Sequence, residues 1–491
     1  MLYALILVPM VSGLMSLLLP TERPQRIILL AAATTHLALA IAIVFRQPEP
    51  ILNDWVQVDA LGLLFLIITS TVFFAAAVYA VGYLQKEIRT PRPDWVEGVL
   101  FSNAPQRLFV GCMLLFLSAM TLVTVSHHLG LLWVAMEGTT LASAPLIYFH
   151  RHHRSLEATW KYLLICSVGI ALALLGVFFL GAAGLSDGKG PEPLLLGNLI
   201  QSAQSLNRTW LQTAFLLLLV GYGTKMGLAP MHTWLPDAHS ESPSVVSALM
   251  SAALLNCAFL GILRVYQIAI AAGAGDFARE LLIAFGLISM AVAAVFIIRQ
   301  ADYKRMLAYS SVEHMGILAL GVGIGGAATF GAMFHAMNHS LAKGLLFLVA
   351  GNILALYRTT ASRGVRGVLH LLPISGGLWI IGFLAITGSP PFSSFFSEYV
   401  ILQAIFTQGH VLVAIMFLAL LSMVFIGMGV AVLRMAQGEP WQKPASPRME
   451  SIWAVAPPIA LAAILLLFGF YLPTRLENMM HNAALLLGGG G

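Results

Sequence analysis

Residues 211–243 read LQTAFLLLLVGYGTKMGLAPMHTWLPDAHSESP, an apolar run that passes into a polar one. A single lysine, Lys225, lies near the end of the apolar part, and Gly227 and Pro230 follow it closely. Proline removes a backbone donor and clashes with the preceding turn, so we expect a helix to break here. Lipid cannot satisfy the backbone groups that such a break frees, so the break must lie inside protein or beside water. The stretch therefore predicts an interrupted membrane helix that carries a buried charge.

The composition of the whole chain agrees with a membrane location. Of the 491 residues, 59% are hydrophobic and 10% are charged, against roughly 25% charged residues in an ordinary soluble domain. Long uncharged runs, such as 61–80 and 281–298, come close to the ~20 residues that a helix needs to cross the hydrocarbon core. We therefore expect an all-α polytopic membrane protein with about fourteen transmembrane helices. Their expected positions are 2–20, 26–45, 60–84, 107–125, 129–149, 158–181, 211–229, 243–270, 278–299, 304–324, 327–356, 373–406, 411–435 and 451–472.

A second interruption lies in the twelfth expected helix, where the sequence reads Thr387-Gly388-Ser389-Pro390-Pro391. Gly/Pro-interrupted segments in corresponding places of two halves are typical of transporters built from inverted repeats, with the ion site near the breaks. We therefore expect two inverted-topology repeats with broken seventh and twelfth helices. The predicted division is N-terminal helices at 1–106, a first repeat at 107–272, a second repeat at 273–436, and a last helix with its tail at 437–491.

Basic residues are distributed unevenly between the two sides of the expected bundle. Most of the 26 Lys and Arg residues lie in loops that follow odd-numbered helices, and cytoplasmic loops accumulate these residues. We therefore expect a multi-pass plasma-membrane protein with both termini on the non-cytoplasmic side. The net charge of +5 does not indicate nucleic-acid binding, because no dense basic run with interleaved aromatic residues is present.

The sequence offers no ligand set for a metal or a redox cofactor. The three cysteines lie in apolar segments, without the spacing that zinc or an iron–sulfur cluster requires. A Gly-rich loop that could hold a cofactor phosphate is also missing. His150, His152 and His153 lie beside two arginines at a helix end, where a solvated interfacial patch is favoured over a metal site. We therefore expect no metal and no cofactor in this chain.

Several ionisable residues lie inside the expected membrane helices, and five of them are candidates for proton transfer. A charge at mid-membrane costs at least about 2.5–3.5 kcal/mol on insertion scales, so each one needs a partner or a function. These residues are Glu137, Lys225, Glu313, Lys343 and Glu398. Lysine and carboxylate suit proton relay, because burial and neighbouring charges can make either of them titrate. The alternative is that they only hydrogen-bond to neighbouring helices, and their number favours a proton pathway.

Histidines extend the expected pathway. His335 and His339 precede Lys343 at spacings of four residues, which places all three on one face of a helix. Histidine titrates near neutral pH and can link two water-filled segments. We therefore include His335 and His339 in the pathway.

Polar residues after the first break are possible members of the same pathway. They are His232, Asp237 and His239. Asp237 and His239, together with Glu241, could equally cap the second half of the broken helix, and the sequence does not separate these two roles.

Three stretches of the chain closely resemble a known family. They are 225–239 (KMGLAPMHTWLPDAH), 304–311 (KRMLAYSS) and 342–348 (AKGLLFL). The first resembles the signature of the antiporter-like subunits of respiratory complex I, a family shared with Mrp-type cation/proton antiporters and membrane-bound nickel–iron hydrogenases. The resemblance covers nearly the whole chain. It implies a fold of about fourteen helices with inverted repeats and a hydrated axis through the middle of the membrane.

The resemblance also implies roles for single residues. It places the proton-pathway residues of the family at Glu137, Lys225, His339, Lys343 and Glu398. Glu137 and Lys225 would form an ion pair whose opening and closing changes the proton affinity of the lysine.

Two positions depart from the common pattern of that family. Asn256 stands where many relatives carry Lys or His on the eighth helix, and it cannot change its charge. Glu313, followed by His314, stands where complex I subunits usually carry a neutral residue. Both departures resemble the hydrogenase-4 component F group, so we count Asn256, Glu313 and His314 as possible pathway residues.

The internal repeat gives a separate reason to consider Glu313. This residue lies in the second helix of the second repeat, as Glu137 lies in the second helix of the first. We therefore expect Glu313 within the influence of Lys343 or Glu398. The alternative is a position near the cytoplasmic end of its helix, where it would be solvated or paired with a loop arginine.

We interpret the chain as a proton-translocating membrane subunit of a multi-subunit energy-converting oxidoreductase, hydrogenase-type or complex I-like, without a redox site of its own. The expected partners are other membrane subunits, a peripheral redox module, the lipid bilayer and the transported ion. This ion is a proton, and the sequence leaves a sodium ion open as the alternative. The alternative is a secondary cation/proton antiporter or an ion-driven uptake subunit without redox chemistry. A passive membrane anchor is disfavoured by the cost of the buried charges.

Overall fold

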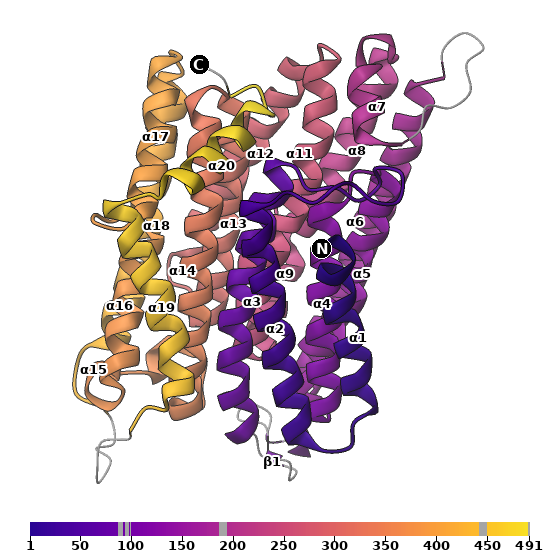
Figure 1. The fold of residues 1–491 in the computed structure, drawn as a ribbon. Coiled ribbons are helices and arrows are strands. Elements are labelled where there is room, and N and C mark those ends of the chain that lie inside the picture. Colours follow the sequence, from indigo (N-terminus) through magenta and orange to yellow (C-terminus); the bar gives the residue numbers. More distant parts are fainter. Residues whose placement is uncertain (87–91, 94–97, 99, 186–193, 441–448, 490–491) are drawn as a thin grey trace.

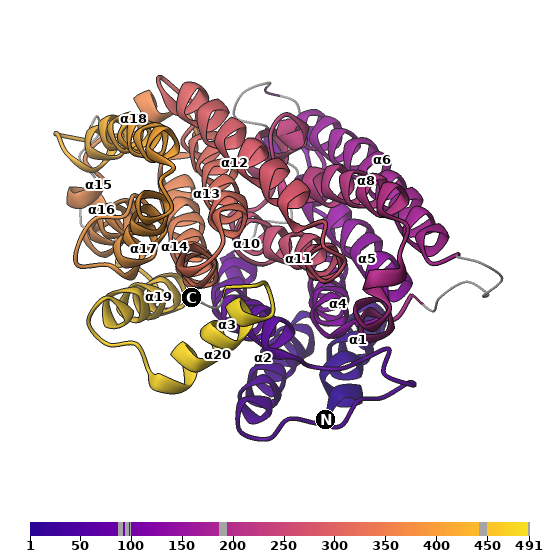
Figure 2. The ribbon, with the colours of Figure 1, turned by 90° about the horizontal axis from the view of Figure 1, so that it is seen from above.

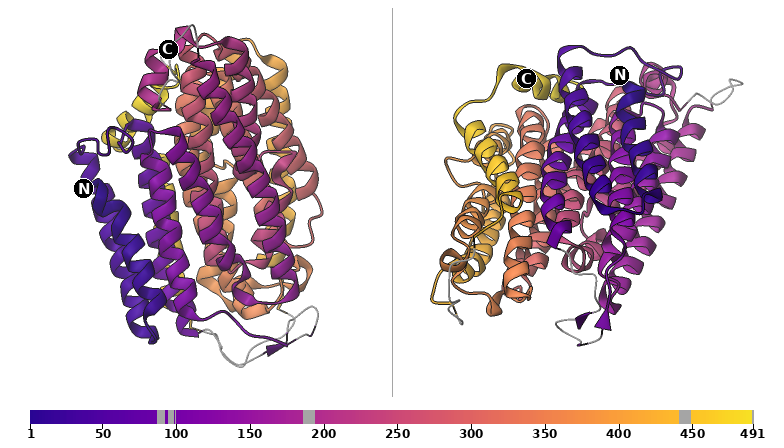
Figure 3. Two further views of the ribbon diagram at one scale, coloured as in Figure 1. Left: turned by 90° about the vertical axis from the view of Figure 1, so that its right-hand side faces the viewer. Right: turned by 60° about the horizontal axis from the view of Figure 1, so that its bottom comes forward.

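The computed structural model describes residues 1–86, 92–93, 98, 100–185, 194–440 and 449–489. Its helices stand side by side in one bundle (Figures 1 and 3). Strands in the described part are limited to β1 (Arg92–Pro93) and β2 (Leu100–Phe101), a short antiparallel pair in a loop. Four of the loop cations, Arg89, Lys189, Lys443 and Arg448, lie outside the described residues.

Twelve helical segments of the described chain are long and apolar enough to cross a membrane. They are α2 (Glu22–Phe45), α3 (Ala60–Lys86), α4 (Gln106–Val125), α5 (Leu129–Ile147) with η1 (Tyr148–His150), α6 (His153–Ala183), α8 (Arg208–Met226) through α9 (Trp234–Glu241), α10 (Ser244–Leu249) through α11 (Leu255–Ala271), α12 (Gly275–Ile297), α13 (Tyr303–Ile324), α14 (Ala327–Tyr357), α18 (Val411–Ala436) and α19 (Ile452–Phe470). Two shorter apolar helices, α1 (Leu2–Leu18) and α16 (Pro373–Ile386), lie at two other expected spans. The all-α polytopic class is confirmed, and the count of about fourteen crossings stays a prediction.

Both expected interruptions are present in the helices. α8 ends before Gly227, whose φ of +83° is a left-handed conformation that glycine adopts without strain. A 3-10 turn, η3 (Met231–Thr233), then leads into α9. In the second half, α16 ends before the Gly388 turn, and α17 (Ser393–Thr407) continues the chain. The two breaks thus fall where the Gly/Pro pattern placed them.

A third irregularity, which the sequence pattern does not predict, lies between α10 and α11. The turn η4 (Met250–Leu254) is π-helical, so one extra residue is accommodated inside a continuous helix. Turns of this kind occur frequently at functional sites. This one packs against α14 in the middle of the bundle.

The most buried helices form the middle of the bundle. Seen from above, α10, α11, α13 and α14 are surrounded by the other helices (Figure 2). In the apolar stretch of the segment from α10 to α11, all residues are buried. In the apolar stretch of α18, only 22% of the residues are buried. Outer helices can therefore expose apolar side chains, and the polar residues of the central helices find their partners within the protein.

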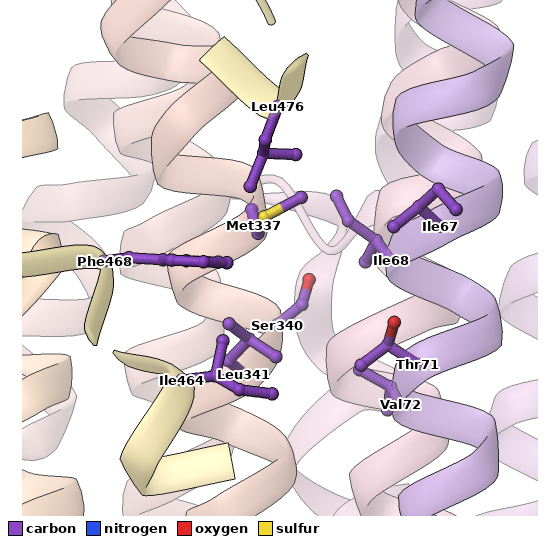
Figure 4. A pocket seen from close by; sticks show the side chains of 10 residues that line it. All are labelled: Ile67, Ile68, Thr71, Val72, Met337, Ser340, Leu341, Ile464, Phe468 and Leu476. Atoms are coloured by element: carbon purple, nitrogen blue, oxygen red, sulfur yellow. The ribbon is translucent and has the colours of Figure 1, made fainter. Parts of the chain in front are cut away.

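The tail after α19 contains a further helix, α20 (Thr474–Leu485), that was expected only as a tail. It crosses α3 and α14 near one end of the bundle (Figures 1 and 2). Together with α3, α14 and α19 it encloses a cavity of about 120 Å³ (Figure 4). The lining side chains are apolar except for Thr71 and Ser340. The sequence pattern of α20 is weak, because only a few apolar residues such as Met479 and Met480 face inward.

An ion pair fixes the segment before α3 to α11. Arg264 is buried, and its guanidinium donates to the two carboxylate oxygens of Asp59 at 2.5 and 2.7 Å. The ring of His127 lies 3.8 Å from the same carboxylate. Burial by itself raises the pKa of Asp59, but the charge and the hydrogen bonds of Arg264 outweigh burial and hold this pKa well below its usual range.

We predict that Asp59→Asn lowers the free energy of unfolding by about 3–5 kcal/mol, because it leaves the Arg264 guanidinium buried without its counter-ion. The pair should also make stability depend on pH. Because the pKa of Asp59 is depressed in the folded state, its contribution is complete above the unfolded pKa, near 4, and declines as the pH falls further. Thermal unfolding of the purified protein in detergent, at neutral pH and at about pH 3, measures both effects. Asp54→Asn, at an exposed residue of the same loop, is the control, and an equal loss in this variant would contradict the prediction.

Candidate functional site

Lys225 lies in the last turn of α8, directly before the first break. Its side chain is fully buried, and Nζ donates to Thr140 Oγ1 at 2.6 Å and to Tyr162 OH at 2.8 Å. The ammonium also lies 4.8 Å from the centroid of the Tyr162 ring, a cation–π distance. The two hydroxyls belong to α5 and α6, so this lysine joins three helices.

Glu137 is connected to Lys225 through Thr140. The Thr140 hydroxyl donates to one carboxylate oxygen of Glu137 at 3.2 Å, and Ser167 donates to the other at 3.3 Å. In the described part of the chain, no salt bridge joins Glu137 directly to Lys225. The structure thus links the two residues through a hydroxyl, and the ion pair that opens and closes stays a prediction. A hydroxyl has one proton to donate and lone pairs to accept, so Thr140 can contact the carboxylate and the ammonium at once.

Neutral polar groups connect α11 and the π-helical turn with α13 and α14. Asn256 Nδ2 donates to Ser340 Oγ at 2.6 Å, and the hydroxyls of Ser251 and Ser311 lie 2.8 Å apart. His339 Nε2 lies 3.3 Å from the Ser251 carbonyl oxygen. Asn256 is thus buried in a polar network, as a neutral link rather than a charged one.

Lys343 is fully buried in α14 and is held by α13. Its Nζ donates to the Leu307 carbonyl at 2.7 Å and to Ser310 Oγ. Glu313, one turn further along α13, is 2% exposed and lies within electrostatic range of both Lys343 and Glu398. The alternative of a solvated Glu313 at a helix end is therefore wrong, and this carboxylate belongs to the buried cluster of the second half.

Histidines form a hydrogen-bonded row through α13, α14 and α17. His314 Nδ1 lies 2.8 Å from His335 Nε2, and His335 Nδ1 lies 2.9 Å from Ser397 Oγ. The ring centroids of His314 and His339 are 5.1 Å apart. All three imidazoles are buried, and together with Lys343 the α14 pair occupies the expected single face of that helix.

Glu398 lies one turn beyond the start of α17, beside the second break. Its side chain is 8% exposed, and Oε1 has no hydrogen-bond partner among the described residues. The other oxygen packs against the backbone of Gly388, where an added Cβ would overlap it. Gly388 also has a φ of +62°. The break therefore needs glycine here both for its backbone conformation and for the close approach of the carboxylate.

The acidic residues after the first break form surface ion pairs and do not cap α9. Asp237 accepts from Lys161 at 2.9 Å and from Arg305 at 2.6 Å. Glu241 lies 3.7 Å from His152. The start of α9 has no side-chain cap. The structure thus brings Asp237 to a partly exposed charge network and not to the buried row.

His232 and His239 are both buried, but their surroundings differ. His232 lies 6.0 Å, centroid to centroid, from the ring of Tyr309 near the first break. His239 stacks on Phe347 at 4.9 Å, and neither of its ring nitrogens has a hydrogen-bond partner in the described part. It lies within electrostatic range of Lys304 and Lys343. A buried imidazole without protein partners is a place for ordered water, so His239 extends the polar core of the second half.

Comparison with known proteins identifies the family. A family model described as NADH:quinone oxidoreductase/Mrp antiporter, TM, matches residues 126–425, a range that contains the whole cluster from Glu137 to Glu398. The chain belongs to this family. It is 34% identical over 454 residues to the hydrogenase-4 component F homolog of Methylacidiphilum infernorum, and the match covers 91% of each protein.

Solved structures of multi-subunit complexes share the fold of this NADH:quinone oxidoreductase/Mrp antiporter family member. A chain of the membrane-bound sulfane sulfur reductase, an archaeal respiratory membrane complex, matches with a TM-score of 0.85 and 22% identity. A chain of the Mrp complex from a Dietzia species matches with a TM-score of 0.85 and 19% identity. Each match covers 99% of this chain and 97% of the other.

Sequence reasoning missed one buried lysine of this family member. Lys304 is 1% exposed, and its Nζ donates to the backbone carbonyls of Ser240 at 3.0 Å and Ser242 at 2.6 Å, at the end of α9. Because it follows the helix-capping Asp302 in a charged segment, the pattern groups it with loop cations. Only its contacts reveal that it holds the end of the broken helix, and no periodic signal could have shown this.

We predict that Gly388→Ala lowers the free energy of unfolding by about 1–3 kcal/mol, because the new methyl group overlaps the Glu398 carboxylate in a packed interior. The matched control is Gly377→Ala in α16, where an added Cβ meets nothing within 4 Å. Thermal unfolding of both purified variants gives the comparison. Equal stability of the two variants would show that the contact between the break and Glu398 is not tight.

Proposed function

We propose that this chain is the proton-translocating membrane subunit of a multi-subunit energy-converting oxidoreductase, of the hydrogenase or complex I-like type. The observation that carries the proposal is the series of ionisable residues inside the helix bundle, from the half-buried Glu137 and the buried Lys225 to the buried Lys343, Glu313 and Glu398. A relative that matches nearly the whole chain is named as a hydrogenase-4 component F homolog. Buried charges of this number are costly, and proton transfer is a function that repays the cost.

In the first half, the charge of Lys225 is coupled to Glu137 through a hydroxyl. The Thr140 proton points to the carboxylate while its oxygen accepts from the ammonium. If Glu137 or Lys225 changes its charge, that residue no longer holds the Thr140 hydroxyl in this orientation, and the hydroxyl can rotate. The two bonds therefore form and break together, as expected for a short polarised chain.

Between the two halves, the groups that the described side chains offer are neutral. Asn256, Ser340 and Ser251 can orient water but cannot carry a net charge. Protons would cross this region on bridging water molecules, which hydrogen-bond nearly as well as direct partners. His339, beside the Ser251 carbonyl, is the first titratable group on the far side.

In the second half, a proton on Lys343 has both carboxylates and imidazoles within reach. Glu313 is in electrostatic range of Lys343 on one side and Glu398 on the other. The row of His314, His335 and Ser397 then leads toward the second break. The contacts among His314, His335 and Ser397 are of hydrogen-bond length, which general acid–base transfer requires, and bridging water would connect Lys343 and Glu313 to this row.

Protons rather than sodium ions fit the chemistry of the site. The central position of each half is a buried lysine, whose ammonium is held by hydroxyl and carbonyl oxygens. A sodium ion would need those oxygens as its own ligands and would be repelled by the ammonium at this distance. We therefore assign protons as the transported species.

The partners of the chain follow from its relatives and from what its sequence lacks. The structures that share its fold are chains of multi-subunit membrane complexes, so other membrane subunits are expected beside it. Electrons would pass through a peripheral redox module.

We also infer a location in the plasma membrane, with both termini on the non-cytoplasmic side. The inferred repeats are 107–272 and 273–436, between the flanking segments 1–106 and 437–491.

The alternative function is cation/proton antiport without redox chemistry, which the shared fold with an Mrp chain favours. Purification from the native membrane separates the two. Co-purifying nickel–iron or quinone-reducing subunits support the proposed function, whereas small membrane subunits without redox cofactors support the alternative.

We predict that Lys225→Ala and Glu137→Gln each abolish proton flux, because each removes one end of the charge switch. Thr140→Val should lower flux at least about tenfold, since it removes a hydrogen bond to a charged group worth about 1.5–3 kcal/mol. Thr139→Val is the matched control, because the Thr139 hydroxyl donates only to a carbonyl of its own helix. A pH-sensitive dye inside vesicles that contain the purified complex measures the flux. Wild-type flux in both Lys225→Ala and Glu137→Gln would refute the switch.

We predict that Glu313→Gln reduces proton flux more than His314→Gln does. Glu313 lies within the field of both Lys343 and Glu398, and the amide removes its charge, whereas a glutamine at 314 can still hydrogen-bond to His335. The same vesicle assay compares the two variants at equal amounts of assembled complex. Unchanged flux in Glu313→Gln would remove this residue from the pathway.

A further inference from the structure

The cluster at the second break has the donor set of a transition-metal site. His314, His335 and Glu398 each offer one ligand atom, and these three atoms lie within 4.8 Å of one another. Among the described residues, this is the one group of three or more such side chains at that spacing. The donors come from α13, α14 and α17, so the sequence shows no metal-binding motif.

A carboxylate oxygen of this cluster without a partner points to a ligand. Glu398 Oε1 is buried and has no hydrogen-bond partner in the described part of the protein. A carboxylate oxygen in that position lacks the contact that burial normally requires. A cation is the ligand that such an oxygen accepts most strongly.

The second ring nitrogen of His335 is already oriented as in metal sites. His335 Nδ1 lies 2.9 Å from Ser397 Oγ. Metal-binding histidines use their second nitrogen in this way, because the outer hydrogen bond fixes the ring and its tautomer. The outer contact thus leaves His335 Nε2 facing His314 Nδ1 at 2.8 Å.

We propose that His314, His335 and Glu398 bind a divalent transition-metal ion of the Zn²⁺ or Co²⁺ type, taken up from solution, with water as the fourth ligand. A tetrahedral ion of this kind holds nitrogen and oxygen ligands at about 2.0–2.2 Å, which places the ligands about 3.3 Å from each other. The two imidazole nitrogens need to separate by only about half an ångström. The ion takes the place of the proton between the two nitrogens, and that proton moves to the second nitrogen of His314, Nε2, so that both imidazoles bind as neutral ligands.

The donor set favours an ion of this type over other divalent cations. Two imidazoles and one carboxylate select Zn²⁺, Co²⁺ or Ni²⁺ over Mg²⁺ and Ca²⁺, which prefer oxygen ligands. An occupied site would interrupt the row from His314 to Ser397 and block proton flux, a consequence that rests on the proposed function.

Co²⁺ titration of the purified full-length chain in detergent, after treatment with a chelator, tests the site directly. The wild-type chain should show saturable, intense visible absorption of four-coordinate Co²⁺, and added Zn²⁺ should displace it. His335→Gln and Glu398→Gln should each weaken binding at least about tenfold, since even the outer partners of metal ligands have effects of this size. His239→Gln, which changes a buried histidine outside the cluster, should bind Co²⁺ like the wild type.

The same Co²⁺ titration can also refute the proposed metal site. Absence of the four-coordinate spectrum in the wild-type chain, or its persistence in both ligand variants, would refute the site. If the ligand variants do not fold, X-ray absorption at the zinc edge of the wild-type chain decides instead: about two imidazoles with light-atom ligands support the site, and any other shell refutes it. These measurements do not depend on proton flux, so they stand apart from tests of the proposed function.

Discussion

Inside a bilayer, a polar group must find its partner within the protein, and the architecture of this chain follows from that constraint. Each helix break frees backbone groups, and each break lies beside buried charged side chains in the protein interior. The surrounding helices turn polar residues such as Glu137 and Lys225 toward the interior, and many of their exposed side chains are apolar. The polar core can exist only because α10, α11, α13 and α14 are enclosed by other helices.

The two halves satisfy the constraint with different chemistry. In the first half, one lysine is held by two hydroxyls, and one of these hydroxyls contacts a carboxylate. In the second half, Lys343 is held by a carbonyl and a hydroxyl, and Glu313, Glu398 and the histidines provide the remaining titratable groups. In the predicted repeats, Lys225 at the first break corresponds to Glu398 at the second, and Lys343 lies one helix earlier, so the two buried lysines hold different repeat positions. Many protonation states are available in the second half and few in the first.

Much of this organisation could be predicted from the sequence, and the limits have physical reasons. Apolar run length and Gly/Pro breaks are local signals, so the membrane helices and both interruptions were predictable. Residue contacts between helices are not local. The role of Thr140, the burial of Lys304 and the gathering of His314, His335 and Glu398 all depend on packing between helices that are distant in sequence. The resemblance to a family supplied Glu137 and Lys225 as a pair, but it could not supply the hydroxyl between them.

On the proposed pathway, Asn256 lies between the charged cluster around Lys225 and the one around Lys343. A lysine or histidine at this position could hold a proton, so charge would move stepwise through it. The amide cannot hold a proton, and its Oδ1 has no protein partner among the described residues, while its Nδ2 donates to Ser340. A buried amide oxygen of this kind accepts from water at low cost. On the proposed pathway, transfer between Lys225 and Lys343 would depend on whether water fills the space around Asn256.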